Sequence, residues 1–271
     1  MWRRWHDLHY RWQRGCGRVL CGALCAVAAV RAYSDEHLPD VVDRIRPSIV
    51  GVGTYAATRR PPAVLAGTGF VVGDGHLAAT NLHVVARALD GEHKEHLVVF
   101  IGRGRDSEYR NVVVERTDEE HDLTLLRFTG AAVAATTLPT DAQATVREGT
   151  AIAFTGYPIG AVLGLYPVTH QGIVSALTPI AIPATTAREL SAGKIAALRA
   201  PYDVIQLDAT AYPGNSGSPV YRQSDGALVG IINQVLVKGK KEDALRDPSA
   251  ITYAIPVRFL RALLGTADAP P

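Results

Sequence analysis

His83, Asp122 and Ser216 are far apart in this chain, but together they could supply a hydroxyl nucleophile, a base that activates it and an acid that orients the base. Ser216 lies in the run Gly214-Asn215-Ser216-Gly217, where the glycines favour a tight turn whose N–H groups can point at an oxyanion. A serine becomes nucleophilic at neutral pH only beside a base, and the base needs an acid that holds its tautomer. Glycine and serine are also ordinary β-turn residues, so the turn alone does not indicate catalysis.

The segments around the other two residues predict how they are positioned. His83 follows an apolar, strand-like run that ends at Thr80-Asn81, and a short helical segment comes next, so the imidazole should lie at a strand-to-helix corner. Asp122 directly precedes a predicted strand in which apolar and polar residues alternate. The chain order histidine, aspartate, serine is informative, because other serine hydrolase folds use different orders.

Two neighbouring residues compete with Asp122 for a catalytic role. Asp118 is a rival carboxylate, but it lies in a polar turn without a strand to hold it, so we prefer Asp122. His121 is adjacent to Asp122 in the chain. Because neighbours on a strand point to opposite faces, His121 should not share the role of Asp122.

Five blocks of the sequence carry a family resemblance, and they occur in the family's order. Together they resemble the protease domain of the HtrA/Deg family of trypsin-like serine proteases, over most of the chain from Asp40 to Leu264. The blocks are residues 67–85, 121–126, 172–177, 208–221 and 251–257. The resemblance implies that His83 is the general base, Asp122 its orienting carboxylate and Ser216 the nucleophile. It also implies an oxyanion hole at the turn of Gly214, Asn215 and Ser216, formed by the N–H groups of Gly214 and Ser216.

The same resemblance implies a substrate specificity and a mode of activation. By the family's geometry, Thr210 and Ala211 line the base of the S1 pocket, and Ile231, Ile232 and Asn233 form a wall. Such a neutral pocket should prefer small to medium aliphatic side chains, because a buried lysine or arginine would lack a counter-ion. Pancreatic-type relatives carry an aspartate where this chain has Asn215. We therefore expect no zymogen cleavage beyond removal of a leader.

The pattern of short apolar runs and turn residues predicts an all-β fold of two antiparallel six-stranded barrels, as in chymotrypsin and trypsin. The catalytic residues would meet in the cleft between the barrels. The expected strands of the first barrel are 48–56, 66–72, 76–79, 96–101, 109–115 and 122–128. Those of the second are 150–156, 166–176, 203–208, 217–222, 227–237 and 250–255.

Short helices are expected at both ends of this fold, over 35–46 and 257–264. Unlike many members of the family, the chain is not expected to carry a PDZ domain. The expected organisation is a signal peptide at 1–32, a helical segment at 33–47, a first barrel at 48–129, a linker at 130–149, a second barrel with its closing helix at 150–265, and a tail at 266–271.

The first 32 residues are predicted to be an export signal. Five arginines precede an apolar run of twelve residues, Val19 to Val30, and small residues allow cleavage after Ala32. The run is short for a membrane span, which needs ~20 residues, so we expect a periplasmic or secreted protein without a stable span. An uncleaved anchor and a mitochondrial presequence are the alternatives. All three cysteines lie in this leader, so no disulfide is expected in the mature chain.

Charge and motif content narrow the remaining function classes. The chain carries a net charge of +2, and without the first 32 residues it has 22 basic against 25 acidic residues, or −3. This balance does not support nucleic-acid binding.

The motif His93-x-x-His96, with Glu92 and Glu95 beside it, lacks a third ligand and is interpreted as a solvated turn. No metal or other cofactor is expected, and Lys238, Lys240 and Lys241 form a basic loop that either is solvated or binds acidic side chains.

The sequence therefore predicts an exported serine endopeptidase that cleaves unfolded or exposed protein segments, in protein quality control. The alternative from another class is a catalytically quiet protein that holds peptides in the same cleft. Protein or peptide substrates are the expected partners, and a homotrimer through Tyr33 and Leu38 is an expectation by analogy with relatives. Residues 178–201 form a long insertion, which we expect either to gate the cleft as a helical lid or to cover the second barrel.

Overall fold

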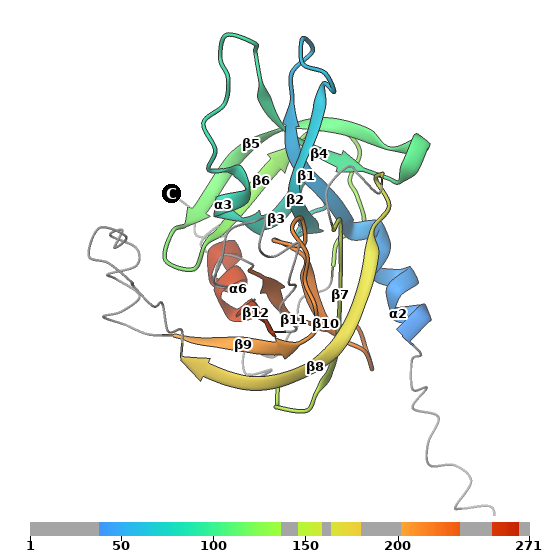
Figure 1. Ribbon diagram of the computed structural model, residues 1–271, viewed down its shortest axis with the longest axis vertical. Coiled ribbons are helices and arrows are strands. Elements are labelled where there is room, and N and C mark those ends of the chain that lie inside the picture. The colour runs from blue at the N-terminus through green and yellow to red at the C-terminus, as the bar shows by residue number, and fades with distance from the viewer. Residues whose placement is uncertain (1–37, 137–145, 159–163, 180–201, 234–250, 266–271) are drawn as a thin grey trace, which may run out of the picture. The chain divides into compact units, whose positions relative to one another are not determined.

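The computed structural model describes residues 38–136, 146–158, 164–179, 202–233 and 251–265. Within these ranges, twelve strands form two closed antiparallel barrels of six strands each (Figure 1). The predicted fold class is confirmed. The expected signal peptide, the basic loop at Lys238 to Lys241 and the expected helix within 178–201 lie outside the described residues.

Each barrel is built from six strands that are consecutive in the chain. The first has the order β1-β2-β3-β6-β5-β4 and the second the order β10-β11-β12-β9-β8-β7. The strands of the first barrel are β1 (Ile49–Tyr55), β2 (Ala63–Val72), β3 (Leu77–Asn81), β4 (His96–Ile101), β5 (Glu108–Asp118) and β6 (Leu123–Phe128). Those of the second are β7 (Ala151–Gly156), β8 (Val168–Pro179), β9 (Asp203–Asp208), β10 (Pro219–Arg222), β11 (Leu228–Ile232) and β12 (Ile251–Pro256).

In the part of the chain that the structure describes, three α-helices accompany the barrels: α2 (Leu38–Ile45), α3 (Leu82–Val85) and α6 (Val257–Gly265). α2 and α6 are the two predicted terminal helices. Each buries one apolar stripe at helical spacing, with Val41 and Ile45 in α2 and Leu260 and Leu263 in α6. None of the helices in the described ranges has the length and apolarity that crossing a membrane requires.

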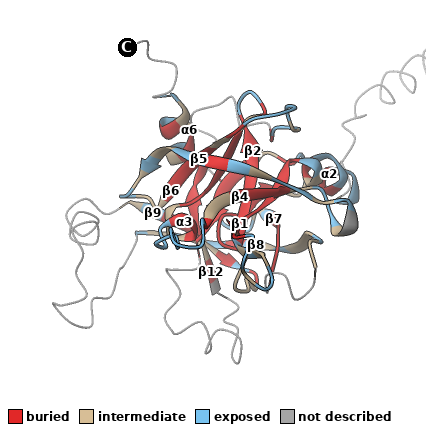
Figure 2. Ribbon diagram, turned by 90° about the horizontal axis from the view of Figure 1, so that it is seen from above, coloured by how far each residue is buried: buried red, intermediate tan, exposed pale blue. Residues whose placement is uncertain are grey.

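In β2 and β6, successive side chains alternate between two different hydrophobic cores. In β2, Phe70 and Val72 belong to one buried cluster, whereas Val71 belongs to the cluster inside the first barrel. β6 repeats this pattern, since Leu125 and Leu126 belong to different clusters. Strands buried on both faces appear as continuous apolar runs, because neither face needs polar residues. Figure 2 shows this burial along β2 and β6, with exposed residues in the connections and along β5 and β8.

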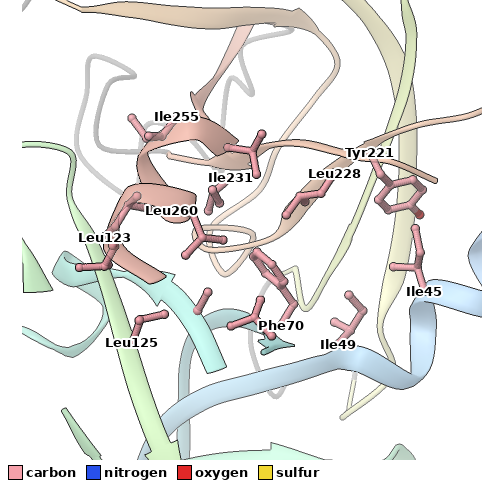
Figure 3. Packing of buried hydrophobic residues seen from close by; sticks show 14 of the residues in the cluster. Ile45, Ile49, Phe70, Leu123, Leu125, Tyr221, Leu228, Ile231, Ile255 and Leu260 are labelled. Carbon is pink, nitrogen blue, oxygen red and sulfur yellow. The ribbon is translucent and has the colours of Figure 1, made fainter. Parts of the chain in front are cut away.

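The cluster that contains Phe70 joins the two barrels. It brings Leu125 of the first barrel together with Ile231 and Ile255 of the second, and α2 and α6 add Ile45 and Leu260 (Figure 3). All of these side chains are at most 4% exposed. Burying one such side chain contributes about 1.5–3 kcal/mol, so this shared core fixes the docking of the barrels.

The turn before β4 is exposed at 91–94, as a solvated turn should be, but the prediction did not foresee that Glu95 at its end is a buried carboxylate. The side chain of Glu95 is only 3% exposed. It accepts hydrogen bonds from Thr54 Oγ1 at 2.6 Å, Arg59 Nη1 at 2.5 Å and the Asp90 N–H at 2.9 Å, and it also pairs with Arg87. These partners stabilise the ionised form and lower the pKa of Glu95 from an ordinary 4.5 to about 2. Glu95 therefore connects β1, through Thr54, to the segment after α3 that contains Arg87 and Asp90.

We expect Glu95→Gln to lower the free energy of unfolding at pH 7 by about 3 kcal/mol, because the amide cannot satisfy two arginines. The folded-state pKa lies below the unfolded one. The contribution is therefore complete above pH ~4.5 and is lost as pH falls toward ~2. Urea unfolding at pH 7 and pH 3 should show a gap between the two proteins that narrows in acid. The exposed Glu92→Gln in the same turn is the control. A gap of equal size at both pH values would contradict the assignment.

Candidate active site

His83 and Asp122 come together in the geometry expected of a base and its orienting acid. His83 lies in α3, directly after β3, which confirms the predicted strand-to-helix corner. Its Nδ1 is 2.5 Å from Asp122 Oδ2, and its backbone N–H donates to Asp122 Oδ1 at 2.8 Å. Because an ionised carboxylate only accepts hydrogen bonds, Nδ1 carries the proton and Nε2 is left as the free base.

The backbone of Asp122 is held as firmly as its side chain. Asp122 ends the turn before β6 with φ at 53°, a left-handed conformation that aspartate tolerates better than most residues. Its carbonyl accepts hydrogen bonds from the Leu82 N–H and from Asn81 Nδ2, both at 3.1 Å. Asn233 Nδ2 reaches from the second barrel to Asp122 Oδ2 at 2.9 Å. Asp122 is thus oriented by both barrels.

Ser216 lies in a turn whose free N–H groups match an oxyanion hole. The Asn215 N–H donates to Tyr212 O at 2.9 Å and the Gly217 N–H to Ile232 O at 3.0 Å. Within the described part of the chain, the N–H groups of Gly214 and Ser216 have no hydrogen-bond partner. Gly214 has φ at 102°, which only glycine adopts readily. The arrangement leaves two donors available for a developing oxyanion.

Thr68 of β2 connects this turn to the first barrel. Its side chain is fully buried, and its Oγ1 donates to Gly214 O at 2.7 Å and accepts from the Tyr157 N–H at 2.9 Å. The Thr68 N–H also donates to Ser216 O at 2.9 Å. A Cβ on Gly217 would lie 2.0 Å from Thr68 O, so the second glycine of the motif is required by this close approach. The sequence analysis did not identify Thr68.

His170 of β8 is a second residue that the sequence analysis missed. Its Nε2 lies 3.5 Å from Asn215 Nδ2, and its ring stacks on Phe154 at 4.9 Å between centroids. Burial lowers the pKa of His170, which favours the neutral ring that can accept a hydrogen bond. A neutral imidazole thus contacts Asn215, the position at which pancreatic-type relatives carry an aspartate. That no zymogen cleavage is needed stays a prediction.

Asp118, the rival carboxylate, pairs with another histidine. Its Oδ2 lies 2.7 Å from His121 Nδ1, and the His121 ring stacks on Phe259 of α6 with centroids 3.6 Å apart. Tyr202 also packs against His121. Burial, followed by the negative charges of Asp122 and Asp118, raises the pKa of Tyr202, so this phenol stays neutral beside the candidate acid. Asp118 and His121 therefore anchor the closing helix, as a pair separate from His83.

His83 and Ser216 line one cavity of about 280 Å³, together with Gly214. Among the described residues no hydrogen bond links His83 to the Ser216 hydroxyl. Such contacts commonly tighten only when substrate binds. The cavity therefore brings the candidate base, nucleophile and oxyanion donors to one place.

The predicted S1 residues are placed differently from one another. Thr210 and Ala211 are half-buried in the segment leading to the turn, and Ala211 packs against the core of the second barrel. The side chains of Ile231 and Ile232 are fully buried in two cores, so only their backbone could face a substrate. Asn233 directs its amide to Asp122. The sequence analysis named Asn233 but did not foresee this contact.

No group of three acidic, histidine or cysteine side chains within the described ranges could hold a metal ion. His93 instead pairs with Asp90, with 2.7 Å between Nδ1 and Oδ2, and His96 Nδ1 lies 3.0 Å from Lys94 O. The two histidines of the motif therefore make separate local contacts.

Comparisons with known proteins agree with the fold. The trypsin-like peptidase domain family matches residues 67–231, so the chain belongs to that family. The relatives of this chain include HtrA proteases. The chain is 30% identical over 233 residues to serine protease HTRA1B of Danio rerio, which covers 85% of this chain and 41% of that protein. It is 25% identical over 271 residues to the putative serine protease HhoA of Synechocystis sp., with 91% and 60% covered.

A solved structure of an HtrA-type protease, AlgW with a tripeptide, shares the fold with a TM-score of 0.60 and 23% identity. The match covers 84% of this chain and 62% of that chain. The chain spans about two-fifths of the length of its HTRA1 relatives. The family and fold are therefore established for the protease domain, and the predicted HtrA relationship is confirmed.

Thr68→Val should leave the half-buried Gly214 carbonyl and the buried Tyr157 N–H without their present partner. Each unpaired group costs about 1–3 kcal/mol, so we expect the free energy of unfolding to fall by about 2–5 kcal/mol. We also expect peptidase kcat to fall at least ~10-fold, since the turn of Ser216 loses its anchor. Thr68→Ser keeps the hydroxyl and is the matched control. Urea unfolding and peptide hydrolysis would measure both effects, and a valine variant that matches the serine variant would refute the role of Thr68.

Proposed function

We propose that the protein is a serine endopeptidase with the catalytic residues His83, Asp122 and Ser216. The observation that carries this proposal is the Asp122 carboxylate, which accepts hydrogen bonds from both the ring and the backbone of His83. This geometry leaves Nε2 of His83 as a base in the cavity that Ser216 lines. A protein that only bound peptides would not need this arrangement, so the alternative of a catalytically quiet binder is less well supported.

In the proposed reaction, Ser216 Oγ attacks the carbonyl carbon of the scissile peptide bond while His83 Nε2 takes the hydroxyl proton. The carbonyl oxygen becomes an oxyanion and accepts hydrogen bonds from the N–H groups of Gly214 and Ser216. His83 then gives its proton to the leaving amine, and an acyl-enzyme ester remains on Ser216. Water attacks this ester with His83 again as base, which releases the acid and restores the enzyme.

We also propose that the acyl side of the substrate is selected by a neutral S1 pocket at Thr210 and Ala211. Both residues lie a few positions before the Ser216 turn and are half-buried. Neither carries a charge, so a lysine or arginine side chain would enter without a counter-ion, at a large desolvation cost. Cleavage should therefore follow small to medium aliphatic residues.

The biological setting is a further part of the proposal. The arginine-rich leader with its short apolar run supports export to the periplasm or the medium. By analogy with HtrA proteases, the proposed substrates are unfolded or exposed protein segments, the proposed role is quality control, and the proposed assembly is a homotrimer. Size measurement of the mature chain in solution would test the trimer directly.

The two carboxylates give the sharpest test of the catalytic assignment. Asp122→Asn should lower kcat by roughly 10⁴-fold, because an amide no longer holds His83 in the tautomer that leaves Nε2 free. Asp118→Asn makes the same chemical change four residues away, where the carboxylate bonds to His121 and not to His83, and should leave kcat within a few-fold of the original. Steady-state hydrolysis of a peptide with an aliphatic residue before the scissile bond would measure both. Equal losses in the two variants would contradict the assignment of Asp122.

Covalent labelling tests the nucleophile independently of substrate choice. A fluorophosphonate probe should label the unsubstituted protein at Ser216, and mass spectrometry of the digested product would locate the adduct. Ser216→Ala should abolish labelling, and His83→Ala should slow it by orders of magnitude, since the residues act as a unit. Labelling that persists in Ser216→Ala would show that another residue is the nucleophile.

A further inference from the structure

The cavity beside Ser216 extends over the first barrel, and its walls are unlike those of the predicted S1 pocket. Thr54 and Arg87 supply its polar groups, in addition to His83 and the Ser216 turn. Its volume of about 280 Å³ is close to the lower end of the roughly 300–1,000 Å³ usual for ligand sites. It can therefore hold one bulky side chain with the adjoining backbone. The apolar walls are Val64, Leu65 and Ala66 of β2, Val84 and Val85 of α3, and Leu97 of β4.

The position of the cavity indicates which part of a substrate would occupy it. Only Gly214 and Ser216 come from the second barrel, and none of the predicted S1 residues lines the cavity. The leaving amine must come within reach of His83, because His83 protonates it. His83 lines this cavity, so the chain that follows the scissile bond would pass over the first barrel.

The polar end of the cavity carries an exposed cation, the guanidinium of Arg87. Arg59 and Arg87 both pair with the single carboxylate of Glu95. Glu95 also accepts hydrogen bonds from Thr54 and from the Asp90 N–H, so its oxygens are fully engaged. The side chain of Arg87 is 63% exposed, and a guanidinium has five N–H donors. Arg87 therefore keeps exposed N–H donors for an incoming carboxylate.

We propose that this cavity is the binding site for the leaving-group side of the substrate. The residue directly after the scissile bond places a bulky aliphatic side chain against the β2, α3 and β4 walls. The following residue presents an acidic side chain to Arg87. The inference rests on the proposed peptidase function and adds to it a substrate class, in which an aliphatic residue and then an acidic one follow the scissile bond.

Capture of the acyl-enzyme by added amines tests this side of the site alone. An activated ester of an aliphatic peptide acylates Ser216, and the acyl group then passes either to water or to the amine of an added dipeptide amide. In the second case the amine nitrogen forms the new amide bond, the Ser216 ester bond breaks, and His83 moves the amine proton to Ser216 Oγ. Chromatography of the products gives the ratio of amide to acid.

We expect leucyl-aspartyl amide to capture at least ~10-fold more acyl group than glycyl-aspartyl amide, because only leucine fills the apolar cavity. It should capture about threefold more than leucyl-asparaginyl amide, as an exposed ion pair allows, and this second ratio should shrink at high salt. If the glycyl and leucyl amides capture equally, the apolar subsite is refuted. If the aspartyl and asparaginyl amides capture equally, the role of Arg87 is refuted.

Two substitutions separate the parts of the proposal. Arg87→Gln should remove the preference for the aspartyl amide and keep the preference for leucine. Ala66→Trp, at an exposed position of the wall, should remove the preference for leucine. Arg103→Gln removes an exposed arginine outside the cavity and should change neither ratio. Each ratio compares the capture of two amines by the same variant, so a change in the overall stability of that variant does not alter the ratio.

The same assay distinguishes a failure of this inference from a failure of the proposed function. If no acyl-enzyme forms and the ester is not hydrolysed, the peptidase function is refuted and the subsite with it. If the ester is hydrolysed through Ser216 but the amines capture without preference, only the subsite is refuted.

Discussion

The site depends on one buried threonine that ties the two barrels together. Thr68 belongs to the first barrel, yet its hydroxyl and its backbone N–H hold the carbonyls of Gly214 and Ser216 in the second. Without these bonds the buried Ser216 carbonyl and the half-buried Gly214 carbonyl would lose their partners, and an unpaired buried group costs about 1–3 kcal/mol. Fixing them also fixes the direction of the neighbouring N–H groups that would meet an oxyanion. The nucleophile turn is therefore shaped by a barrel to which it does not belong.

The shared hydrophobic core makes this cross-barrel contact possible. Strands such as β2 and β6 are apolar on both faces, and one face builds the barrel interior while the other builds the interface. Helices α2 and α6 pack onto the same interface cluster through Ile45 and Leu260. A core of this kind is close-packed and deforms little, so it can hold hydrogen-bonding groups to within a few tenths of an ångström. The precision of the site is thus a product of packing at the interface.

Carboxylates around the site have distinct roles because their surroundings differ. Asp122 contacts Asn233 and His83, and His83 lines the cavity. Asp118 pairs with His121, and that pair packs under α6. Glu95 is buried between two arginines and supports the loop that carries Arg87. The same chemical group thus orients a base, anchors a helix and presents a cation, according to its partners.

Sequence patterns were sufficient for the fold class, the positions of most strands and the candidate residues His83, Asp122 and Ser216. Their signals are local: apolar periodicity, a strand-to-helix corner, and a glycine-flanked serine. They were not sufficient for Thr68, for the contact of Asn233 with Asp122, or for the burial of Glu95. Thr68 and Gly214 are 146 residues apart, and Asn233 and Asp122 are 111 apart, so no local pattern marks either pair. A threonine in an apolar strand or a glutamate in a polar turn has no distinctive signal, because its partners are chosen only when the barrels close and dock.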